Sequence, residues 1–154
     1  MPGHFKANFT QKITNPKNKT IHYAGKVRFS NASLMKWSYS IPTSKEVCTD
    51  GKKLTVVDHD LEQVSTYFIS KGFNLSEIIK EANPYKKNIY VAHYLGKSYT
   101  IQTDGKGRLQ SVAYYDDLDN KVQIIFKNIK YGKGAFPMQK MRCSYPKTYD
   151  EIRG

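Results

Sequence analysis

The stretch Met35-Lys36-Trp37-Ser38-Tyr39-Ser40-Ile41 alternates between large apolar side chains and small or charged ones. In an extended chain successive side chains point to opposite faces, so this pattern predicts a β-strand with one buried face. The first, third, fifth and seventh residues would share the buried face. Lys36 and the two serines would lie on a solvated face. Pro42 follows at once and predicts the end of the strand.

The same alternation recurs along most of the chain, between short stretches rich in turn-forming residues. Just before this strand, Val27 and Phe29 oppose Lys26 and Arg28. Further strands are predicted at 54–57, 63–69, 88–94, 98–103, 109–115 and 122–128. Turns are predicted at Asp50-Gly51, Asp104–Gly107 and Asp116–Lys121. Many short strands joined in this way predict an antiparallel meander of about ten strands.

A single helix is predicted at 74–82, in the middle of the chain. Asn74 can cap its first turn, and Glu77 follows three residues later as in a capping box. One apolar stripe runs through Leu75, Ile78, Ile79 and Ala82, and Asn83-Pro84 predicts the helix end. A helix of about eight residues is too short to cover such a sheet. The apolar face of the sheet is therefore either closed into a barrel or left partly open for an apolar guest.

The length and composition favour one globular domain over residues 1–154. The chain is 39% hydrophobic and 13% aromatic, which is typical of a folded protein rather than a disordered one. No run of about 18 apolar residues predicts a membrane-spanning helix. Met1-Pro2-Gly3-His4 leads directly into patterned sequence, without the apolar core of a signal peptide. We expect either a cytoplasmic protein or a processed or shortened form of an exported one.

The charge is strongly basic, with 25 Lys and Arg against 13 Asp and Glu and a formal net charge of +12. Such an excess favours anionic partners, namely nucleic acid, anionic lipid headgroups or acidic proteins. The alternative is a lineage whose secreted proteins are basic in general. Only Lys52-Lys53 and Lys86-Lys87 are adjacent basic pairs, so the charge is spread along the chain.

The sequence carries no signature of catalysis or of metal binding. The motifs of serine hydrolases, zinc proteases, P-loop enzymes and dinucleotide-binding proteins are absent, so we expect no enzyme, no cofactor and no metal site. The histidines are isolated in sequence, and the two aspartate clusters lie in predicted turns, where Asp is ordinary. Cys48 and Cys143 either pair in an oxidising compartment or are separately buried as apolar residues.

A single-stranded nucleic-acid platform is the competing interpretation of mixed basic and aromatic strands. Such a platform needs aromatic and cationic side chains on one exposed face. Here the alternation sends them to opposite faces, which argues against it. We therefore expect no nucleic-acid partner, and the overall charge is what keeps this alternative open.

Four segments, in order and at matching spacing, resemble the LolA family of lipoprotein carriers. The opening strand is similar to the family's SFxAxFTQ, and the segment around Trp37 to its Arg-Pro-x-x-Phe-x-Trp. A Ser-Asp-Gly-Lys-x-Leu turn and a Glu-Gln-Val strand start follow. The matching segments are His4–Lys12, Leu34–Tyr39, Thr49–Leu54 and Leu61–Val64, with looser matches at Asp104-Gly105 and Met141–Pro146.

The resemblance implies a mainly β fold, an incomplete antiparallel barrel with a helical lid over its concave apolar face. It also implies a monomeric periplasmic chaperone that binds the acyl chains of lipoproteins. Such a carrier receives them from an inner-membrane lipoprotein-releasing ABC transporter and delivers them to an outer-membrane acceptor. The alternative within this fold is a carrier or receptor for another amphiphile, as LolB-like proteins are.

Three departures from the family pattern concern the lid. The family's Arg, associated with a hydrogen-bonded closed lid, falls on Asn31, so any latch here must be weaker or differently built. The Phe before the Trp becomes Met35, which makes the mouth more adaptable. The family's N-terminal helix has no counterpart in this numbering.

The candidate binding residues are the apolar members of the alternating strands. They either line a cavity for acyl chains or pack beneath the helix as core, since both roles use the same chemistry. They are Val27, Phe29, Met35, Trp37, Tyr39, Val112, Tyr114, Ile124 and Phe126.

Overall fold

Strands dominate the computed structural model, which describes residues 4–30, 34–50, 52–68 and 75–153. The strands are β1 (His4–Thr14), β2 (Thr20–Ser30), β3 (Leu34–Ile41), β4 (Lys45–Thr49), β5 (Lys53–Asp58), β6 (Gln63–Phe68), β7 (Ala82–Lys86), β8 (Ile89–Tyr94), β9 (Lys97–Thr103), β10 (Leu109–Tyr115), β11 (Lys121–Gly132) and β12 (Asp150–Arg153). The helices in these ranges are α1 (Leu75–Lys80) and α2 (Met138–Met141), and neither is long and apolar enough to cross a membrane.

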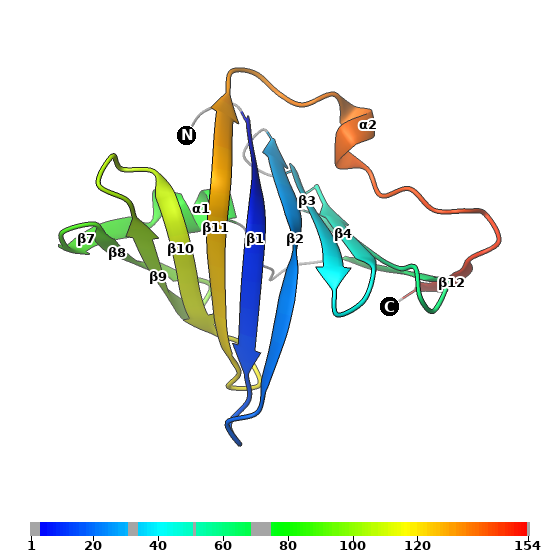
Figure 1. Cartoon of the computed structure of the whole chain (residues 1–154), viewed down its shortest axis with the longest axis horizontal. Helices are drawn as coiled ribbons and strands as arrows, with labels where there is room; N and C mark the ends of the chain where they lie inside the picture. The colour runs from blue at the N-terminus through cyan, green and yellow to red at the C-terminus, as the bar shows by residue number, and fades with distance from the viewer. Residues whose placement is uncertain (1–3, 31–33, 51, 69–74, 154) are drawn as a thin grey trace.

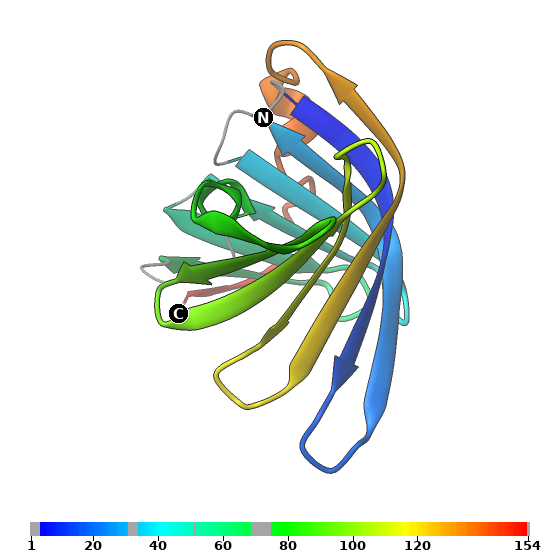
Figure 2. The ribbon, with the colours of Figure 1, turned by 90° about the vertical axis from the view of Figure 1, so that its left-hand side faces the viewer.

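All twelve strands form one sheet in the order β12-β6-β5-β4-β3-β2-β1-β11-β10-β9-β8-β7. Two antiparallel meanders, β1–β6 and β7–β11, are joined by the β1–β11 pairing, and β12 adds to β6 in parallel. The sheet curls strongly, and β7 and β12 remain as its two edges (Figures 1 and 2). The predicted half-open antiparallel barrel is therefore confirmed.

The concave face carries the main core, and the period-two pattern is the reason. Trp37 pairs with Val27, and Met35 with Phe29, so their side chains share this face. The Phe9 ring meets the Trp37 ring edge-on, with 5.0 Å between centroids. Met35 is only 2% exposed, but Ile41 is 55% exposed because it lies at the end of β3. The strand prediction is confirmed, and the burial predicted for its last residue is wrong.

Gly25 is required by a close approach in the middle of this face. It pairs with Phe9 on one side and with Tyr39 on the other. A Cβ atom here would collide with the backbone of Ser38. Without a side chain between them, the rings of Phe9 and Tyr39 approach to 5.1 Å between centroids. The glycine thus lets two aromatic side chains pack across a strand.

Helix α1 lies inside the curve of the sheet, as predicted for a lid (Figure 2). Leu75 and Ile78 are fully buried against the concave core. The helix ends at Lys80, however, and Ala82 begins β7 instead of completing the helix. Pro84 fits there because β7 is an edge strand, which needs no amide on its free side. The predicted cap, Asn74, is outside the described residues.

The convex face is not wholly solvated, contrary to the prediction, because residues 133–149 cross it as a C-terminal strap (Figure 1). Cys143 of the strap forms a disulfide with Cys48 of β4. Lys36 is 12% exposed, lies 3.1 Å from Glu46 and donates to the carbonyl of Arg142 at 2.8 Å. Val57 and Val64, which pair across β5 and β6, and Met141 of the strap are also buried, and none of them belongs to the concave core cluster.

Candidate functional site

The nine predicted binding residues all lie on the concave face, and most of them fill it. Val27, Phe29, Met35, Trp37, Val112, Ile124 and Phe126 are buried in one core cluster, against which Tyr39 and Tyr114 pack half-buried. These residues are therefore brought together as core. Their contact with acyl chains stays a prediction. The predicted latch residue, Asn31, is outside the described residues.

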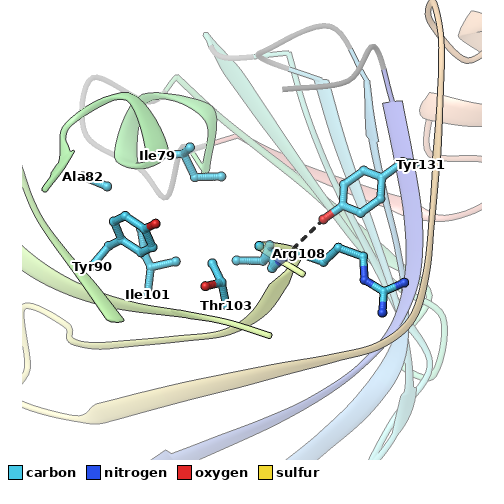
Figure 3. Close-up of a pocket in the computed structure, with 9 residues that line it drawn as sticks. Ile79, Ala82, Tyr90, Ile101, Thr103, Arg108 and Tyr131 are labelled. Atoms are coloured by element: carbon cyan, nitrogen blue, oxygen red, sulfur yellow. Dashed lines mark hydrogen bonds between the residues drawn. The ribbon is translucent and has the colours of Figure 1, made fainter. Parts of the chain in front are cut away.

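Beside this core, an open cavity of about 470 Å³ lies between α1 and the strands β8, β9 and β10. Figure 3 shows Ile79 and Ala82 above it and Tyr90 and Ile101 on the opposite side. Its remaining lining residues are Thr103, Gly107, Arg108, Leu109 and Tyr131. The volume lies within the range of about 300–1,000 Å³ usual for ligand pockets. The lining is mostly apolar, and its polar side chains are Tyr90, Thr103, Arg108 and Tyr131.

Two β-bulges bring Leu109 and Tyr131 to this cavity. The β9–β10 register shifts between Leu109 and Ser111, so Leu109 shares the concave face with Val112 three residues later. The β1–β11 register shifts in the same way, which places Tyr131 on the face of Phe126. Strict alternation would send both residues to the convex face. The Tyr131 hydroxyl accepts a hydrogen bond from the Leu109 amide at 3.3 Å, which ties the two bulged strands together.

Sequence reasoning missed this cavity in part for the same reason. None of its lining residues is among the nine predicted ones, and for Leu109 and Tyr131 the reason is a bulge that reverses the side-chain parity on which those predictions rest. Ile79 and Ala82 were placed on the apolar stripe of the predicted helix, which is the one signal that pointed here.

Arg108 is the one cation among the described residues that line the cavity. Arg108 is half-exposed, and its Nε donates to Asp104 Oδ2 at 2.9 Å. The Asp104 carboxylate also accepts the backbone amides of Arg108 and Lys106, both at 2.9 Å. These contacts, first the Arg108 amide, hold the pKa of Asp104 below its usual value. Asp104 therefore lies in a turn, as predicted, and its lowered pKa keeps it ionised beside the guanidinium that it orients.

Tyrosines close the opposite end of the concave face with neutral hydroxyls. Burial, together with neighbouring Tyr23, raises the pKa of Tyr39 to about 12, and its hydroxyl donates to Gln11 at 2.9 Å. Tyr114 packs on Tyr99 with 4.9 Å between ring centroids, and burial raises its pKa as well. These groups stay uncharged at neutral pH and complete an apolar wall.

The arrangement of mostly apolar lining residues suits binding of an apolar guest. Across the described ranges, no three His, Cys, Asp or Glu side chains are grouped as metal ligands would be. His59 bonds to Glu46 at 2.7 Å and to Tyr149 at 2.9 Å, so it serves to fasten the strap to β4. The polar side chains at the cavity are a threonine, two tyrosines and an arginine, which orient a ligand rather than activate one.

Comparison with known proteins finds relatives of this chain in sequence and in fold. Residues 3–79 match the family described as Outer membrane lipoprotein carrier protein LolA. The outer-membrane lipoprotein carrier protein of Campylobacter jejuni is 35% identical over 97% of this chain and 86% of its own length. That of Wolinella succinogenes is 31% identical over 82% of this chain and 73% of its own.

Solved structures support the fold at low sequence identity. An uncharacterized conserved protein from Thermus thermophilus superposes with a TM-score of 0.62 at 9% identity, covering 100% of this chain and 92% of its own. A LolA superfamily protein from Nitrosomonas europaea superposes with a TM-score of 0.53 at 8% identity, covering 93% and 92%. With the sequence matches and the half-open sheet under a short helix, these results show that the chain belongs to the LolA family.

Proposed function

We propose that this protein is a periplasmic carrier that shields the acyl chains of lipoproteins on their way to the outer membrane. The observation that carries the proposal is the apolar cavity between α1 and the concave face of β8–β10. The relatives from Campylobacter jejuni and Wolinella succinogenes are named as outer-membrane lipoprotein carrier proteins. The disulfide between Cys48 and Cys143 suits an oxidising compartment such as the periplasm.

The cavity can grow only if α1 moves away, because the rest of the concave face is filled by its own core. Opening would expose Leu75 and Ile78, which are fully buried. Burying each such side chain is worth about 1.5–3 kcal/mol, so opening costs about 3–6 kcal/mol. An acyl chain returns about 0.8 kcal/mol per buried methylene, so about four to eight methylenes offset that cost.

The same magnitudes imply two partners. Two or three acyl chains anchor a lipoprotein in a bilayer almost irreversibly, and a carrier that buries them equally well makes the transfer near neutral. Extraction then needs an inner-membrane ABC transporter that hydrolyses ATP, and delivery needs an outer-membrane acceptor. We propose both as partners of a monomeric carrier.

The test uses a fluorescent fatty-acid probe and a matched pair of variants on β10. Leu109→Glu places a carboxylate in the cavity lining, whereas Gln110→Glu places it on the neighbouring exposed position. An unpaired carboxylate beside a methylene chain costs several kcal/mol, so Leu109→Glu should weaken binding at least about tenfold. Gln110→Glu should bind like the wild type. A wild-type protein that binds neither the probe nor a tri-acylated lipopeptide would refute the carrier function.

A further inference from the structure

The convex face of three central strands carries an uncompensated block of positive charge. Strands β1, β2 and β11 contain seven Lys and Arg residues and no Asp or Glu. Their register places all seven on the convex face, opposite the aromatic core. We call this set the basic face; its members are Lys6, Lys12, Lys26, Arg28, Lys121, Lys127 and Lys130.

The cations are neighbours across the strands as well as along them. Lys6 on β1 pairs directly with Lys130 on β11 and with Arg28 on β2, and Arg28 in turn pairs with Lys36 on β3. Like charges in directly opposite positions oppose sheet formation. This row therefore works against folding. Arg28 and Lys36 contact the strap, but within the described residues no ion pair accounts for Lys6 and Lys130.

Little in the described part of the chain neutralises this face. Of the row, Lys36 has a carboxylate neighbour, Glu46 at 3.1 Å, and Arg28 reaches only the carbonyl of Lys140 at 3.3 Å. For the exposed lysines of the basic face, no acidic group lies within 4.0 Å in the parts of the chain that the structure describes.

The basic face is hollowed where the β1–β11 bulge interrupts the ladder. Asn128 adopts a positive φ of 55° at this bulge. A groove of about 310 Å³ opens there, lined by Lys6, Lys26, Arg28, Lys36 and Lys130, with polar Asn8, Ser38 and Asn128 between them. Five cations around one shallow groove form a site for anionic groups such as phosphate esters.

We propose that the basic face adsorbs the protein to a bilayer of anionic phospholipids. The composition of the face favours lipid over protein, because protein interfaces are depleted in lysine and centred on aromatic anchors. All the Phe and Tyr side chains of the three strands point to the concave face instead. Single-stranded nucleic acid would need those rings as stacking surfaces. Flexible lysines suit a diffuse layer of headgroups, which they meet as point charges.

Adsorption through this face leaves the cargo cavity free. The cavity and α1 lie on the concave side, so the bound protein presents them away from the lipid (Figure 2). The contact would hold the carrier at a membrane surface by a salt-reversible attraction, without opening the cavity to the bilayer. It does not depend on the proposed cargo, so the two proposals fail separately.

The test is co-sedimentation with vesicles in which about a third of the phosphatidylcholine is replaced by phosphatidylglycerol, at about 50 mM salt. One triple variant changes Lys6, Lys26 and Lys130 to Gln. The matched control changes Lys52, Lys87 and Lys147, which are exposed elsewhere. Both lower the formal net charge from +12 to +9, because each substitution removes one positive charge. Thermal unfolding checks that both variants remain folded.

We expect wild-type protein to bind anionic vesicles, to ignore pure phosphatidylcholine and to be released at about 200 mM salt. Each lysine near an anionic surface strengthens adsorption about fivefold, so the basic-face triple should bind about a hundredfold more weakly. The control should lie within about fivefold of the wild type. Equal losses in both triples, or no vesicle binding, would overturn the proposal. Basic-face-dependent binding to duplex DNA but not to vesicles would assign the face to nucleic acid instead.

Discussion

Helix α1 and the C-terminal strap cover opposite faces of the sheet by different means. α1 lies on the concave side and is seated by the apolar side chains of Leu75, Ile78 and Ile79. The strap lies on the convex side and is fastened by the Cys48–Cys143 disulfide and by the hydrogen bond from Lys36 to the Arg142 carbonyl. Apolar contacts are non-directional and can be exchanged for those of a guest, whereas a covalent link cannot. The contrast separates a replaceable cover from a permanent one.

Removal of the disulfide should have the largest effect, and only on the strap side. The bond joins residues 95 apart in sequence, so it restricts a long loop of the unfolded chain. Replacing both cysteines by Ala should lower the free energy of unfolding by about 3–5 kcal/mol. Urea unfolding measures this change. Binding of the fatty-acid probe, measured on the fraction that remains folded, should change less than about twofold.

The comparison breaks if the double-alanine variant loses stability and probe binding together. In that case the strap would also shape the cavity from across the sheet. Wild-type protein in the presence of a reductant is the control, because it should match the variant without any change of side-chain volume.

Truncation on the lid side should come next in size. Ile78 is fully buried beneath α1, so Ile78→Ala should lower the free energy of unfolding by about 2–4 kcal/mol. Ile79 is half-buried and lines the cavity, so Ile79→Ala should cost less stability, about 1 kcal/mol, and change probe affinity more. Urea unfolding of the two variants measures how much each isoleucine stabilises the packing of α1. Probe titration measures how much each contributes to the cavity. The reverse ranking would mean that the roles of the two isoleucines are exchanged.

The lid side also shows how far periodicity predicts this fold. Alternation around Trp37 correctly predicted β3, and the Asn83-Pro84 pair correctly marked the region where α1 has ended. Ala82 was misassigned because an apolar residue after a helix continues its stripe as well as it begins a strand. Ala82 is in a strand because β7 pairs with β8, and the sequence around the helix does not contain that partner strand. Tertiary pairing overrode a local pattern.

The candidate site was less predictable than the fold for a physical reason. Core and cavity lining have the same chemistry, so Val112 and Leu109 look alike in sequence although one is core and the other lines the cavity. The two bulges that decide the difference leave no composition signal. The strap has neither periodicity nor helix caps, and two cysteines far apart in sequence do not by themselves imply a pair.

Neutralising Glu46 should have a moderate effect, because this carboxylate holds the two side chains that bond to the strap, Lys36 and His59. Glu46 lies 16% exposed between Lys36 at 3.1 Å and His59 at 2.7 Å. Glu46→Gln removes the charge partner of a mostly buried lysine, so it should lower the free energy of unfolding by about 1–2 kcal/mol. Lys36→Met in the same background should recover part of that loss, because it removes the unpaired charge. A double-mutant cycle from urea unfolding gives the coupling, and additive losses would show that the pair contributes nothing.

The smallest effects should come from two turn carboxylates, one on each side of the comparison. Asp50, beside the strap, accepts the amides of Lys52 and Lys53, both at 2.9 Å, and these bonds lower its pKa. The pKa of Asp104, at the cavity, is lowered by the amides of Arg108 and Lys106. A lowered folded-state pKa gives a stabilisation that is complete above the unfolded value of about 3.9. It is lost as the pH falls through the folded value.

Asp50→Asn and Asp104→Asn should therefore each flatten the acid limb of a stability profile measured from about pH 5 to pH 2.5. For Asp50 the change should stay below about 0.5 kcal/mol, because its carboxylate is exposed and screened by water. Only Asp104→Asn should also alter probe binding, since it releases the Arg108 guanidinium from its 2.9 Å ion pair. A freed cation at the cavity end would then meet the carboxylate of a fatty-acid probe and tighten its binding about twofold. If Asp50→Asn tightens binding equally, the effect comes from net charge rather than from Arg108. Charges on the strap side would then influence the cavity as much as those on the lid side.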